Sequence, residues 1–279
     1  MLPRSPEELA TILGVPEEHL SALSKAAHRL YKCRFELKKS GGRRLIEAPF
    51  PTLKEVQRQL CSKVLNEIPV HKGLHGRPGT SQITAAAAHV GQRVVISMDI
   101  RDFFPSIKVT KLKAELVAVG FSALVAELIC QLSTRKRRLP QGAPTSPVLA
   151  RIVISPLLFR IEGILKPISS TCRFAQFVDD LSLSGPSGLQ RVIPTVSRIF
   201  AENGFPIHPL KTVVMKENEP KEVLGIRVND GLQPGQQFQK KLIEARRTLS
   251  KRNPKRAGLE AWNSTIAKQN ARLRNRIPG

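Results

Sequence analysis

The alternation of apolar and polar residues predicts two strand regions that meet acidic side chains. In VVISMDIRDFFPSI (94–107), Val94, Ile96 and Met98 alternate with Val95, Ser97 and Asp99, at which the alternation ends. A period of two is typical of a strand, because successive side chains point to opposite faces. FAQFVDDLSLSG (174–185) alternates on both sides of an acidic pair. It predicts a hairpin whose turn presents Asp179 and Asp180.

Most of the remaining chain is predicted to be helical. Ser5-Pro6-Glu7-Glu8 is typical of a helix start, with a capping serine, a first-turn proline and acidic residues near the positive helix end. A hairpin is expected over 31–49, around Ser40-Gly41-Gly42, and a loop over 71–82. Helices are expected over 5–30, 52–68, 83–89, 111–119, 122–132, from 146, over 192–203 and over 239–279, the last broken near Asn253-Pro254, and KTVVM and EVLGIRV are each expected to form one strand.

The net charge adds a polyanionic partner to this picture of a globular protein. The 279 residues carry a formal net charge of +23, and 41% of them are hydrophobic. That apolar share is enough to bury a core, which argues against disorder. A charge of this size concerns partners rather than fold, so nucleic acid is the first expectation and an anionic membrane surface the second.

The residue pattern argues against a membrane span, a secretion signal and a paired-cysteine metal site. No run approaches the ~18 consecutive apolar residues of a membrane span. Glu7 and Glu8 stand where a secretion signal would have its apolar core. The four cysteines lie far apart and form no C-x-x-C pair, so we expect buried small apolar residues in a reducing compartment. A cytoplasmic protein without a membrane partner is therefore expected.

The acids within apolar strands are the candidate chemistry. A buried, unpaired carboxylate costs several kcal/mol, so Asp99, Asp179 and Asp180 require a partner or a metal ion. Carboxylate oxygens suit Mg²⁺, which keeps waters and recruits substrate phosphates. Two such ions about 4 Å apart can hold the attacking and leaving oxygens of a phosphoryl transfer. One aspartate on each of two neighbouring strands is what such a site needs, whereas an Asp-Asp pair on a hairpin, taken alone, is more often a solvated turn.

A rigid, proline-rich segment lies between the two acidic regions. In RLPQGAPTSP, three prolines restrict the backbone and Gly142 lets another group approach the main chain closely. One interpretation is a rigid loop before a helix. The other is a platform where Gln141 and the backbone face a nucleotide.

Taken in order, these blocks resemble reverse transcriptases, and most closely those of bacterial retrons. The similarity runs through YKCRFELKKSGGRRLIEAPFPTLKEVQ, GLHGRPGTSQITAAAAH, VVISMDIRDFFPSI, LPQGAPTSP, FVDDLSLSG, GFPIHPLKT and EVLGIRVN. The resemblance implies an α+β right-hand polymerase with fingers, a ferredoxin-like palm of antiparallel sheet plus helices, and a short helical thumb. We expect fingers and palm over 1–235, with N-terminal helices over 1–30, and a basic thumb over 236–279.

The resemblance also implies roles for individual residues. Asp99 and Asp179 are the expected main metal ligands, with Asp180 more peripheral and the Ile100 carbonyl completing the coordination. Phe104 lies where this family places a ring beneath the sugar, which would favour dNTPs over rNTPs. The expected nucleotide-binding residues are Lys39, Arg44, Phe104, Gln141, Gly142 and Lys211, of which Lys211 is a candidate proton donor to the pyrophosphate.

Basic residues are the expected contacts to RNA. Residues 239–279 hold twelve Lys and Arg against two Glu, which favours phosphate tracking by the thumb and salt-dependent binding. The expected nucleic-acid contacts are His75 and Arg77 in the Gly-rich loop and Lys240, Lys241, Arg246, Arg247, Lys251 and Arg252 in the thumb. His89 could contact nucleic acid or be structural, and Trp262 is expected to anchor the thumb.

A retron enzyme would be an RNA-directed DNA polymerase with a specific task. The resemblance implies that it binds a cognate structured non-coding RNA, primes from an internal 2′-OH and copies part of the RNA from dNTPs. The product would be a branched RNA–DNA hybrid (msDNA) used in antiphage defence with a separate effector protein. The sequence departs from the retron pattern at Ala85-Ala86-Ala87-Ala88-His89, Phe177-Val178, Arg151 and Val223-Leu224-Gly225.

Three alternatives remain open at this point. The chain could be another small bacterial reverse transcriptase, either defence-associated or diversity-generating. It could be group II intron-like, although no maturase or endonuclease extension is seen after the expected thumb. It could also be a catalytically silent RNA-binding scaffold, against which the intact Asp99, Asp179 and Asp180 argue.

Overall fold

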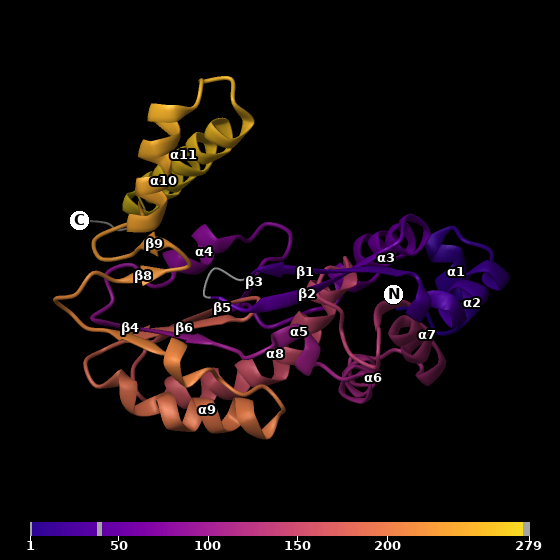
Figure 1. Cartoon of the computed structure of the whole chain (residues 1–279). Helices are drawn as coiled ribbons and strands as arrows, with labels where there is room; N and C mark the ends of the chain where they lie inside the picture. Colours follow the sequence, from indigo (N-terminus) through magenta and orange to yellow (C-terminus); the bar gives the residue numbers. More distant parts are fainter. Residues whose placement is uncertain (1, 38–40, 276–279) are drawn as a thin grey trace. The chain divides into compact units, whose positions relative to one another are not determined.

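The chain forms two compact units, which are described in turn (Figure 1). The computed structural model describes residues 2–37 and 41–275. The first unit takes its residues from 1–71, 101–159 and 202–205, and the second from 72–100, 160–201 and 206–279. The predicted boundary between residues 235 and 236 stays a prediction, and the C-terminal helices belong to the second unit.

The first unit is mostly helical, as expected. The Ser5 hydroxyl accepts a hydrogen bond from the Glu8 amide and Pro6 opens the first helix, so the predicted start signal is confirmed. Helix α5 is a single turn, and it follows in the chain shortly after the strand that ends at Asp99. The helices are α1 (Pro6–Leu13), α2 (Glu17–Ala26), α3 (Pro51–Lys63), α5 (Phe103–Ser106), α6 (Val109–Ala118), α7 (Ala123–Ser133) and most of α8 (Thr145–Leu165), with the 3-10 turns η1 (Ala27–Arg29) and η2 (Leu65–Glu67).

A two-stranded hairpin completes the first unit. Strands β1 (Tyr31–Leu37) and β2 (Arg43–Pro49) pair antiparallel, from Tyr31 opposite Pro49 to Leu37 opposite Arg43. The predicted hairpin is thereby confirmed. One face of β1 is open to solvent, with Phe35 and Leu37 exposed. Cys33 is exposed as well, so the expectation that all four cysteines are buried is wrong for this residue.

The second unit is built on a five-stranded sheet. Its order is β3-β5-β6-β4-β7, and every neighbouring pair is antiparallel except β3 with β5. The strands are β3 (Leu74–His75), β4 (Val94–Asp99), β5 (Arg173–Phe177), β6 (Asp180–Gly185) and β7 (Val213–Met215). The predicted strand at 94–99 and hairpin at 174–185 are confirmed. The prediction that 71–82 is entirely loop is wrong, because Leu74 and His75 pair with Gln176 and Phe177.

The two faces of this sheet differ in chemistry. Val94, Ile96 and Met98 are buried on one face, and Figure 1 shows α9 (Ile193–Glu202) along one side of the sheet and α4 (Gln82–Ala87) on the other. Val95 lies on the opposite face and packs in one apolar cluster with residues of α4. Since side chains alternate, Asp99 shares the face of Val95.

A small sheet and two helices follow. Strands β8 (Glu222–Val223), β9 (Ile226–Arg227) and β10 (Gln233–Pro234) pair antiparallel in the order β10-β9-β8. EVLGIRV is therefore a tight hairpin rather than the single strand we predicted. Leu224 and Gly225 have φ of 53° and 79°, and this left-handed pair reverses the chain between Val223 and Ile226.

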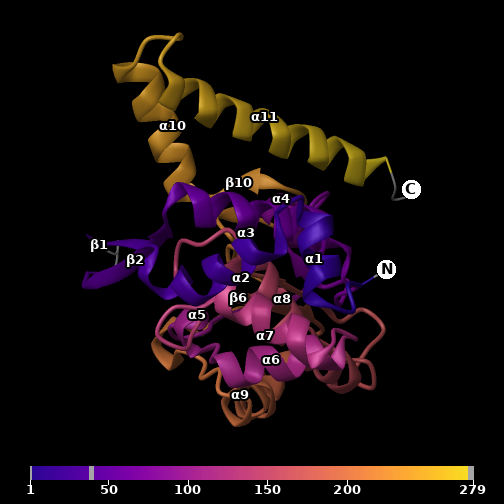
Figure 2. The same cartoon turned by 90° about the vertical axis from the view of Figure 1, so that its right-hand side faces the viewer.

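The C-terminal segment is helical with a break where Asn253-Pro254 predicts one. Helices α10 (Gln236–Thr248) and α11 (Pro254–Arg274) are joined by residues 249–253, and Figure 2 shows them spreading apart from that loop. Ile266 is buried in the cluster that also contains Val95 and Met215 of the sheet. The Trp262 ring packs against this cluster and lies 4.1 Å from the Phe238 ring. Among the described residues, no helix is both long enough and apolar enough to cross a membrane.

Candidate active site

Asp99 and Asp180 lie directly opposite each other in the sheet of the second unit. Asp99 is the last residue of β4 and Asp180 the first of β6, and the two are partners in the antiparallel register. Directly opposed residues of such a pair share a face, with Cβ atoms about 5 Å apart. After Met98 and Leu181, which lie on the other face, the next pair on the same face is Ser97 with Ser182. Two carboxylates therefore lie side by side at the end of this face, next to the small hydroxyl side chains of the two serines.

The turn between β5 and β6 brings in the third carboxylate. Val178 has a φ of 57°, a left-handed conformation that is strained for a β-branched residue. The Gln176 side-chain amide donates to the Val178 carbonyl at 2.9 Å, and the Ile100 amide donates to the Asp179 carbonyl at 2.9 Å. These bonds hold Asp179 next to the end of β4. The predicted grouping of Asp99, Asp179 and Asp180 within one part of the fold is thus observed, while their catalytic role stays a prediction.

Lys211 forms an ion pair with the carboxylate of Asp99. Its ammonium nitrogen lies 3.0 Å from both Asp99 carboxylate oxygens. The 3-10 turn η4 (Pro209–Lys211) is positioned by the His208 amide, which donates to the Asp99 carbonyl at 2.7 Å. The sequence pointed to Lys211 only by resemblance. Nothing in its pattern could identify Asp99 as its partner, because the two residues are 112 positions apart.

Repulsion between the acids is visible at Asp180. Loss of hydration, and then the negative charges of Asp179 and Asp99, raise the pKa of Asp180 to about 7, while Lys211 opposes the rise. A positive charge at this point would relieve that repulsion.

The donor set fits a divalent cation, although the side chains are not arranged around one. Among residues 2–37 and 41–275, no three His, Cys, Asp or Glu side chains are grouped so that they could hold a metal ion as they stand. Both oxygens of Asp99 instead face Lys211. Hard oxygen donors and mutual repulsion are nevertheless the chemistry that a cation such as Mg²⁺ satisfies. Asp99, Asp179, Asp180 and the carbonyl of Ile100 remain the candidate ligands.

Two predicted RNA contacts of the second unit are engaged in local structure. His75 Nδ1 lies 3.0 Å from the Thr84 hydroxyl. Desolvation and the nearby Arg77 charge lower the pKa of His75. The Arg77 side chain donates to the Leu74 carbonyl at 3.3 Å. Both residues are only partly exposed, and their contact with nucleic acid stays a prediction.

His89, for which we left two interpretations open, is structural. Its side chain is fully buried, and Nδ1 lies 2.7 Å from the hydroxyl of Ser184, which is in β6. Burial lowers the pKa of His89 to about 3, with a smaller contribution from His75. A neutral imidazole therefore ties the end of helix α4 to the strand that begins with Asp180.

The other predicted nucleotide-binding residues belong to the first unit. Arg44 is exposed on β2, and its guanidinium lies 3.4 Å from a carboxylate oxygen of Glu36. Phe104 is half-buried, whereas its neighbour Phe103 is in the core, with ring centroids 5.5 Å apart. Lys39 lies outside the described residues.

Gly142 is required by the close approach of β2. Its φ is 125°, and a Cβ added there would lie 3.1 Å from a methyl carbon of Ile46 and 3.2 Å from the Glu47 carbonyl oxygen. The Glu47 amide also donates to the Gln141 carbonyl at 2.7 Å. The group that approaches Gly142 in this structure is thus the protein's own strand. A nucleotide contact at Gln141 and Gly142 stays a prediction.

Sequence analysis missed the residue pair that supports this loop. The Glu47 carboxylate, 3% exposed as a residue, is ion-paired with Arg135. A buried acid in a strand is the same signal that singled out Asp99, but Glu47 lies between charged and apolar residues without clear alternation. The pair joins β2 to the segment that precedes Gln141.

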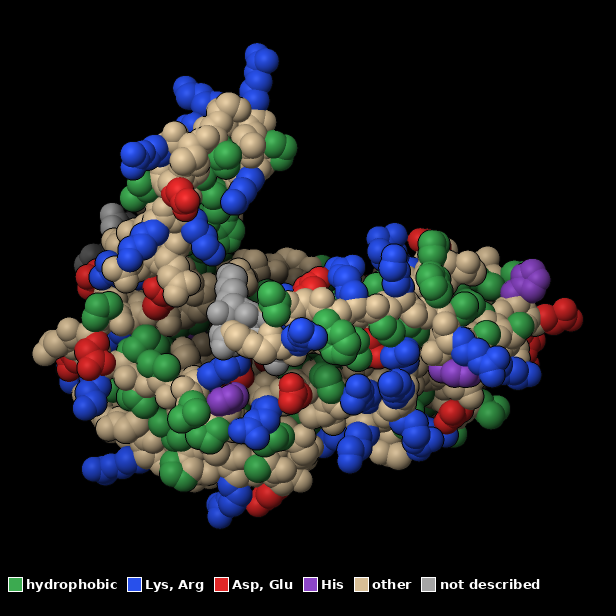
Figure 3. Space-filling view, viewed as in Figure 1, with side chains coloured by type: hydrophobic (Ala, Val, Ile, Leu, Met, Phe, Trp, Pro, Cys, Tyr) green, Lys and Arg blue, Asp and Glu red, His purple; other side chains and the backbone are tan. Residues whose placement is uncertain are grey.

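The predicted thumb residues are exposed on the C-terminal helices and on the loop between them. Figure 3 shows Lys and Arg side chains standing along α10 and α11 on the visible face. Arg246 is engaged by Glu260 in a two-pronged ion pair at 2.7–2.8 Å. The remaining predicted contacts in this segment are exposed, namely Lys240, Lys241, Arg247, Lys251 and Arg252.

Comparison with known families decides the classification. Residues 37–228 match the family model described as reverse transcriptase (RNA-dependent DNA polymerase). The chain belongs to this reverse transcriptase family. The match includes Asp99, Asp179, Asp180 and Lys211, so the acidic cluster lies inside the family domain.

The reverse transcriptase is also similar to individual retron proteins. It is 34% identical to the retron Mx65 reverse transcriptase of Myxococcus xanthus, over 82% of this chain and 59% of that protein. It is 28% identical to the retron Ec86 reverse transcriptase of Escherichia coli, over 67% of this chain and 58% of that protein. The expected resemblance to retron-type enzymes is confirmed. The chain spans about half to three fifths of the length of these relatives.

Solved structures support the fold. A telomerase from Candida albicans, solved with a fragment of telomeric RNA, superposes with a TM-score of 0.55 at 13% identity, covering 74% of this chain and 46% of that one. An apo telomerase from Candida tropicalis, truncated from its C-terminal domain, gives 0.54 at 13% identity, covering 79% and 60%. At such identities the likeness concerns the fold alone. The predicted α+β right-hand polymerase fold is confirmed.

Proposed function

We propose that this reverse transcriptase is an RNA-directed DNA polymerase of the retron type. The observation that carries the proposal is the register of β4 and β6, which sets Asp99 opposite Asp180 with Asp179 in the adjoining turn. Family membership and the similarity to retron enzymes support the same activity.

The chain's own residues would bind and orient the reactants. Asp99, Asp179 and Asp180, with the Ile100 carbonyl, would hold two Mg²⁺ ions, which supply charge stabilisation to a phosphoryl transfer when bound. Arg44 would grip the triphosphate in the two-pronged manner that a guanidinium allows. Lys211, already close to the acids, is suited to carry a proton toward the pyrophosphate. Phe104 would select dNTPs by leaving no room for a ribose 2′-OH.

The retron type implies a defined substrate and product. We infer that the protein binds a cognate structured non-coding RNA and copies part of it from an internal 2′-OH primer. A 2′-OH attacks the dNTP in the same way as a 3′-OH, so no further catalytic residue is needed. The branched RNA–DNA product would serve antiphage defence with a separate effector protein. This work belongs in the cytoplasm, where the free thiols of the described residues are stable.

Primer extension tests the proposal directly. Protein purified with its bound RNA is incubated with dNTPs and Mg²⁺, beside the variants Asp179→Asn and Asp230→Asn. Asp230 is an exposed aspartate of the same unit, so its variant controls for loss of one charge. We expect DNA synthesis by the parent and by Asp230→Asn, and none by Asp179→Asn. Equal product from all three proteins would refute the site, and no product from any would favour a silent RNA-binding scaffold.

Two further measurements separate the remaining alternatives. Sequencing the RNA that co-purifies distinguishes a retron transcript from an intron. The variant Phe104→Val should incorporate rNTPs more readily than the parent does. An unchanged preference for dNTPs would remove Phe104 from the nucleotide site.

A further inference from the structure

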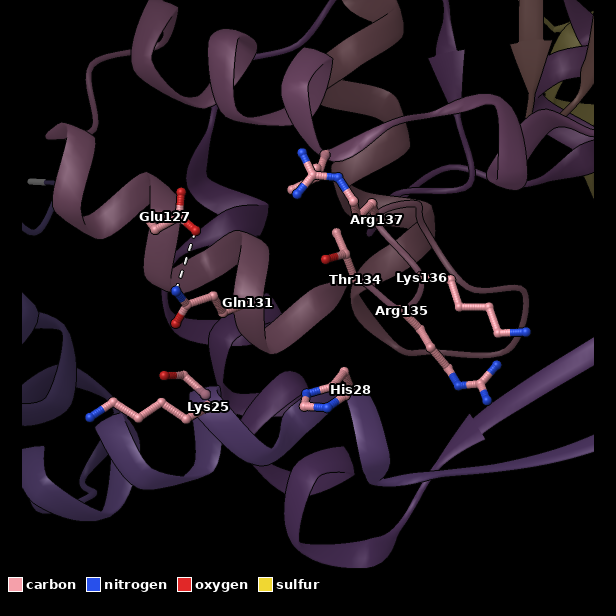
Figure 4. A pocket seen from close by; sticks show the side chains of 10 residues that line it. Lys25, His28, Glu127, Gln131, Thr134, Arg135, Lys136 and Arg137 are labelled. Atoms are coloured by element: carbon pink, nitrogen blue, oxygen red, sulfur yellow. Dashed lines mark hydrogen bonds between the residues drawn. The ribbon is translucent and has the colours of Figure 1, made fainter.

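A basic pocket in the first unit is lined by none of the predicted site residues. Its volume is about 650 Å³, and its walls come from α2, η1, α7 and the turn at 135–138 (Figure 4). We call it the turn pocket. Its charged lining consists of one acid, Glu127, and the basic residues Lys25, His28, Arg135, Lys136 and Arg137.

The turn pocket has an excess of uncompensated positive charge. Glu127 is ion-paired with Lys113 at 2.6 Å, and Arg135 is ion-paired with Glu47. Within the part of the chain that the structure describes, Lys25 and Lys136 have no ion-pair partner, while the charge of Arg137 acts on Glu127, which Lys113 already neutralises. All three are exposed. Three exposed cations around one hollow, with one already paired acid among them, favour an anionic ligand.

The turn that carries two of these cations is strained. Arg135 and Arg138 exchange backbone hydrogen bonds of 2.9 and 3.1 Å, so Lys136 and Arg137 form a two-residue hairpin loop. Their φ values are 50° and 59°. Such loops normally hold Asn-Gly, because both central residues are left-handed. A strained pair of basic residues at this point indicates a function that a relaxed Asn-Gly turn would not serve.

The distribution of the cations indicates the kind of anion. Figure 4 shows Lys25 and Lys136 at opposite sides of the turn pocket, so one phosphate group could not engage both. No Phe, Tyr or Trp lines the pocket to stack on a base. His28 supplies the one ring of the lining, and cations placed on opposite sides of the pocket fit a chain of phosphates better than a single nucleotide.

We propose that the turn pocket docks the sugar–phosphate backbone of an RNA strand. The inference rests on the proposed function, since an RNA-directed polymerase must hold its RNA during copying. Lys25, Lys136 and Arg137 contact successive phosphates, and the strained turn keeps two of them extended from the surface. Such contacts position the RNA without reading its sequence.

The turn offers a variant that removes charge without threatening the fold. Lys136→Asn with Arg137→Gly installs the residues that this turn prefers, so we expect an unchanged or higher melting temperature. Adding Lys25→Ala removes the third cation. The matched control, Arg4→Ala with Lys54→Ala and Arg58→Ala, removes three charges from the same unit outside the pocket.

Salt dependence of RNA binding gives the readout. Anisotropy of a fluorescein-labelled single-stranded RNA of about 30 nucleotides is measured across KCl concentrations. The triple variant should lose about 2 units of slope in log K against log[KCl], since each phosphate contact contributes ~0.7, and its affinity near physiological salt should fall at least about tenfold. The control should change the slope by much less. Equal slopes for the pocket variant and the parent would overturn the proposal.

Two further arms keep the interpretation unambiguous. If inorganic tripolyphosphate binds in calorimetry, and binding is lost in the pocket variant while the RNA slope is unchanged, the pocket is a small-anion site and the proposal is wrong. Extension of a short synthetic primer–template by the pocket variant should match the parent. That result separates failure of docking from failure of the polymerase, which Asp179→Asn reports.

Discussion

Lys211 and Asp99 form an ion pair in which one ammonium faces both carboxylate oxygens at 3.0 Å. The pair links the turn after α9 to the end of β4. It provides a positive charge beside three carboxylates that otherwise repel one another. We therefore expect the pair to connect stability to metal binding, so that its removal has its largest effect when no divalent cation is present.

The variant Lys211→Ala tests this connection. Lys211 is 47% exposed in its side chain, so the pair should contribute only about 0.5–1 kcal/mol to the free energy of unfolding. In EDTA the melting temperature should fall by about 1–4 °C. In Mg²⁺ the fall should be smaller, because the cation replaces the lost charge. Lys216→Ala, at a nearby exposed lysine, should show neither effect. An equal fall in EDTA and in Mg²⁺ would contradict the connection.

Asp180→Asn should stabilise the metal-free protein in a pH-dependent way. The pKa of Asp180 is raised to about 7, so the folded chain keeps a proton that the unfolded chain releases near pH 4. Stability is therefore lost as pH rises from about 4 to about 7. Asparagine avoids this loss, so its advantage should grow across that window and then level off. Melting temperatures in EDTA across pH measure it, with Asp230→Asn as the neutral comparison.

His89 should make the protein sensitive to acid. Its pKa is lowered to about 3 in the folded chain, whereas a histidine in the unfolded chain titrates near 6.5. The free energy of unfolding should fall by about 1.4 kcal/mol per pH unit below about pH 6.5 on its account. His89→Asn should reduce this slope in denaturant titrations, and exposed His19→Asn should preserve it. Parallel slopes for the two variants would show that the neutral buried imidazole has no such effect.

Gly142→Ala should destabilise the first unit. A Cβ there meets β2 at 3.1–3.2 Å, and a φ of 125° suits only glycine. We expect a loss of about 2–3 kcal/mol and weaker dNTP binding. Gly163→Ala is the contrasting substitution, because nothing lies within 4 Å and the residue is inside α8. That variant should be neutral or more stable by up to about 1 kcal/mol. Denaturant midpoints compare the two, and similar midpoints would contradict the close approach of β2.

Most helices and strands could be predicted, because alternation and capping residues lie within the element that they indicate. Alternation around Asp99 and around Asp179-Asp180 identified the two strands that carry the acids, and Ser5-Pro6 identified a helix start. The two-residue strand Leu74–His75 was missed, because its pairing partner is about 100 residues away and so short a strand has no period. EVLGIRV was mistaken for one strand, because an alternating pattern does not show that Leu224 is left-handed.

The acidic residues of the candidate site could be predicted from the sequence, but their ion-pair partners could not. Resemblance located the three aspartates and Lys211, yet the ion pair between Asp99 and Lys211 depends on how distant segments meet. The same holds for Glu47 and Arg135, which are 88 positions apart. The sequence shows that Lys136 and Arg137 are both basic. It could not predict their left-handed turn, because Lys and Arg normally avoid such turns.

Ile266 of α11 completes an apolar cluster whose other members include Val95, from the strand that ends at Asp99. A truncation that removed this helix would take away side chains that pack against the strand ending at Asp99. Engineered fusions or minimised versions should therefore keep residues 254–274 intact even when RNA retention is not wanted. The helix therefore supports the position of Asp99, independently of any contact that it makes with nucleic acid.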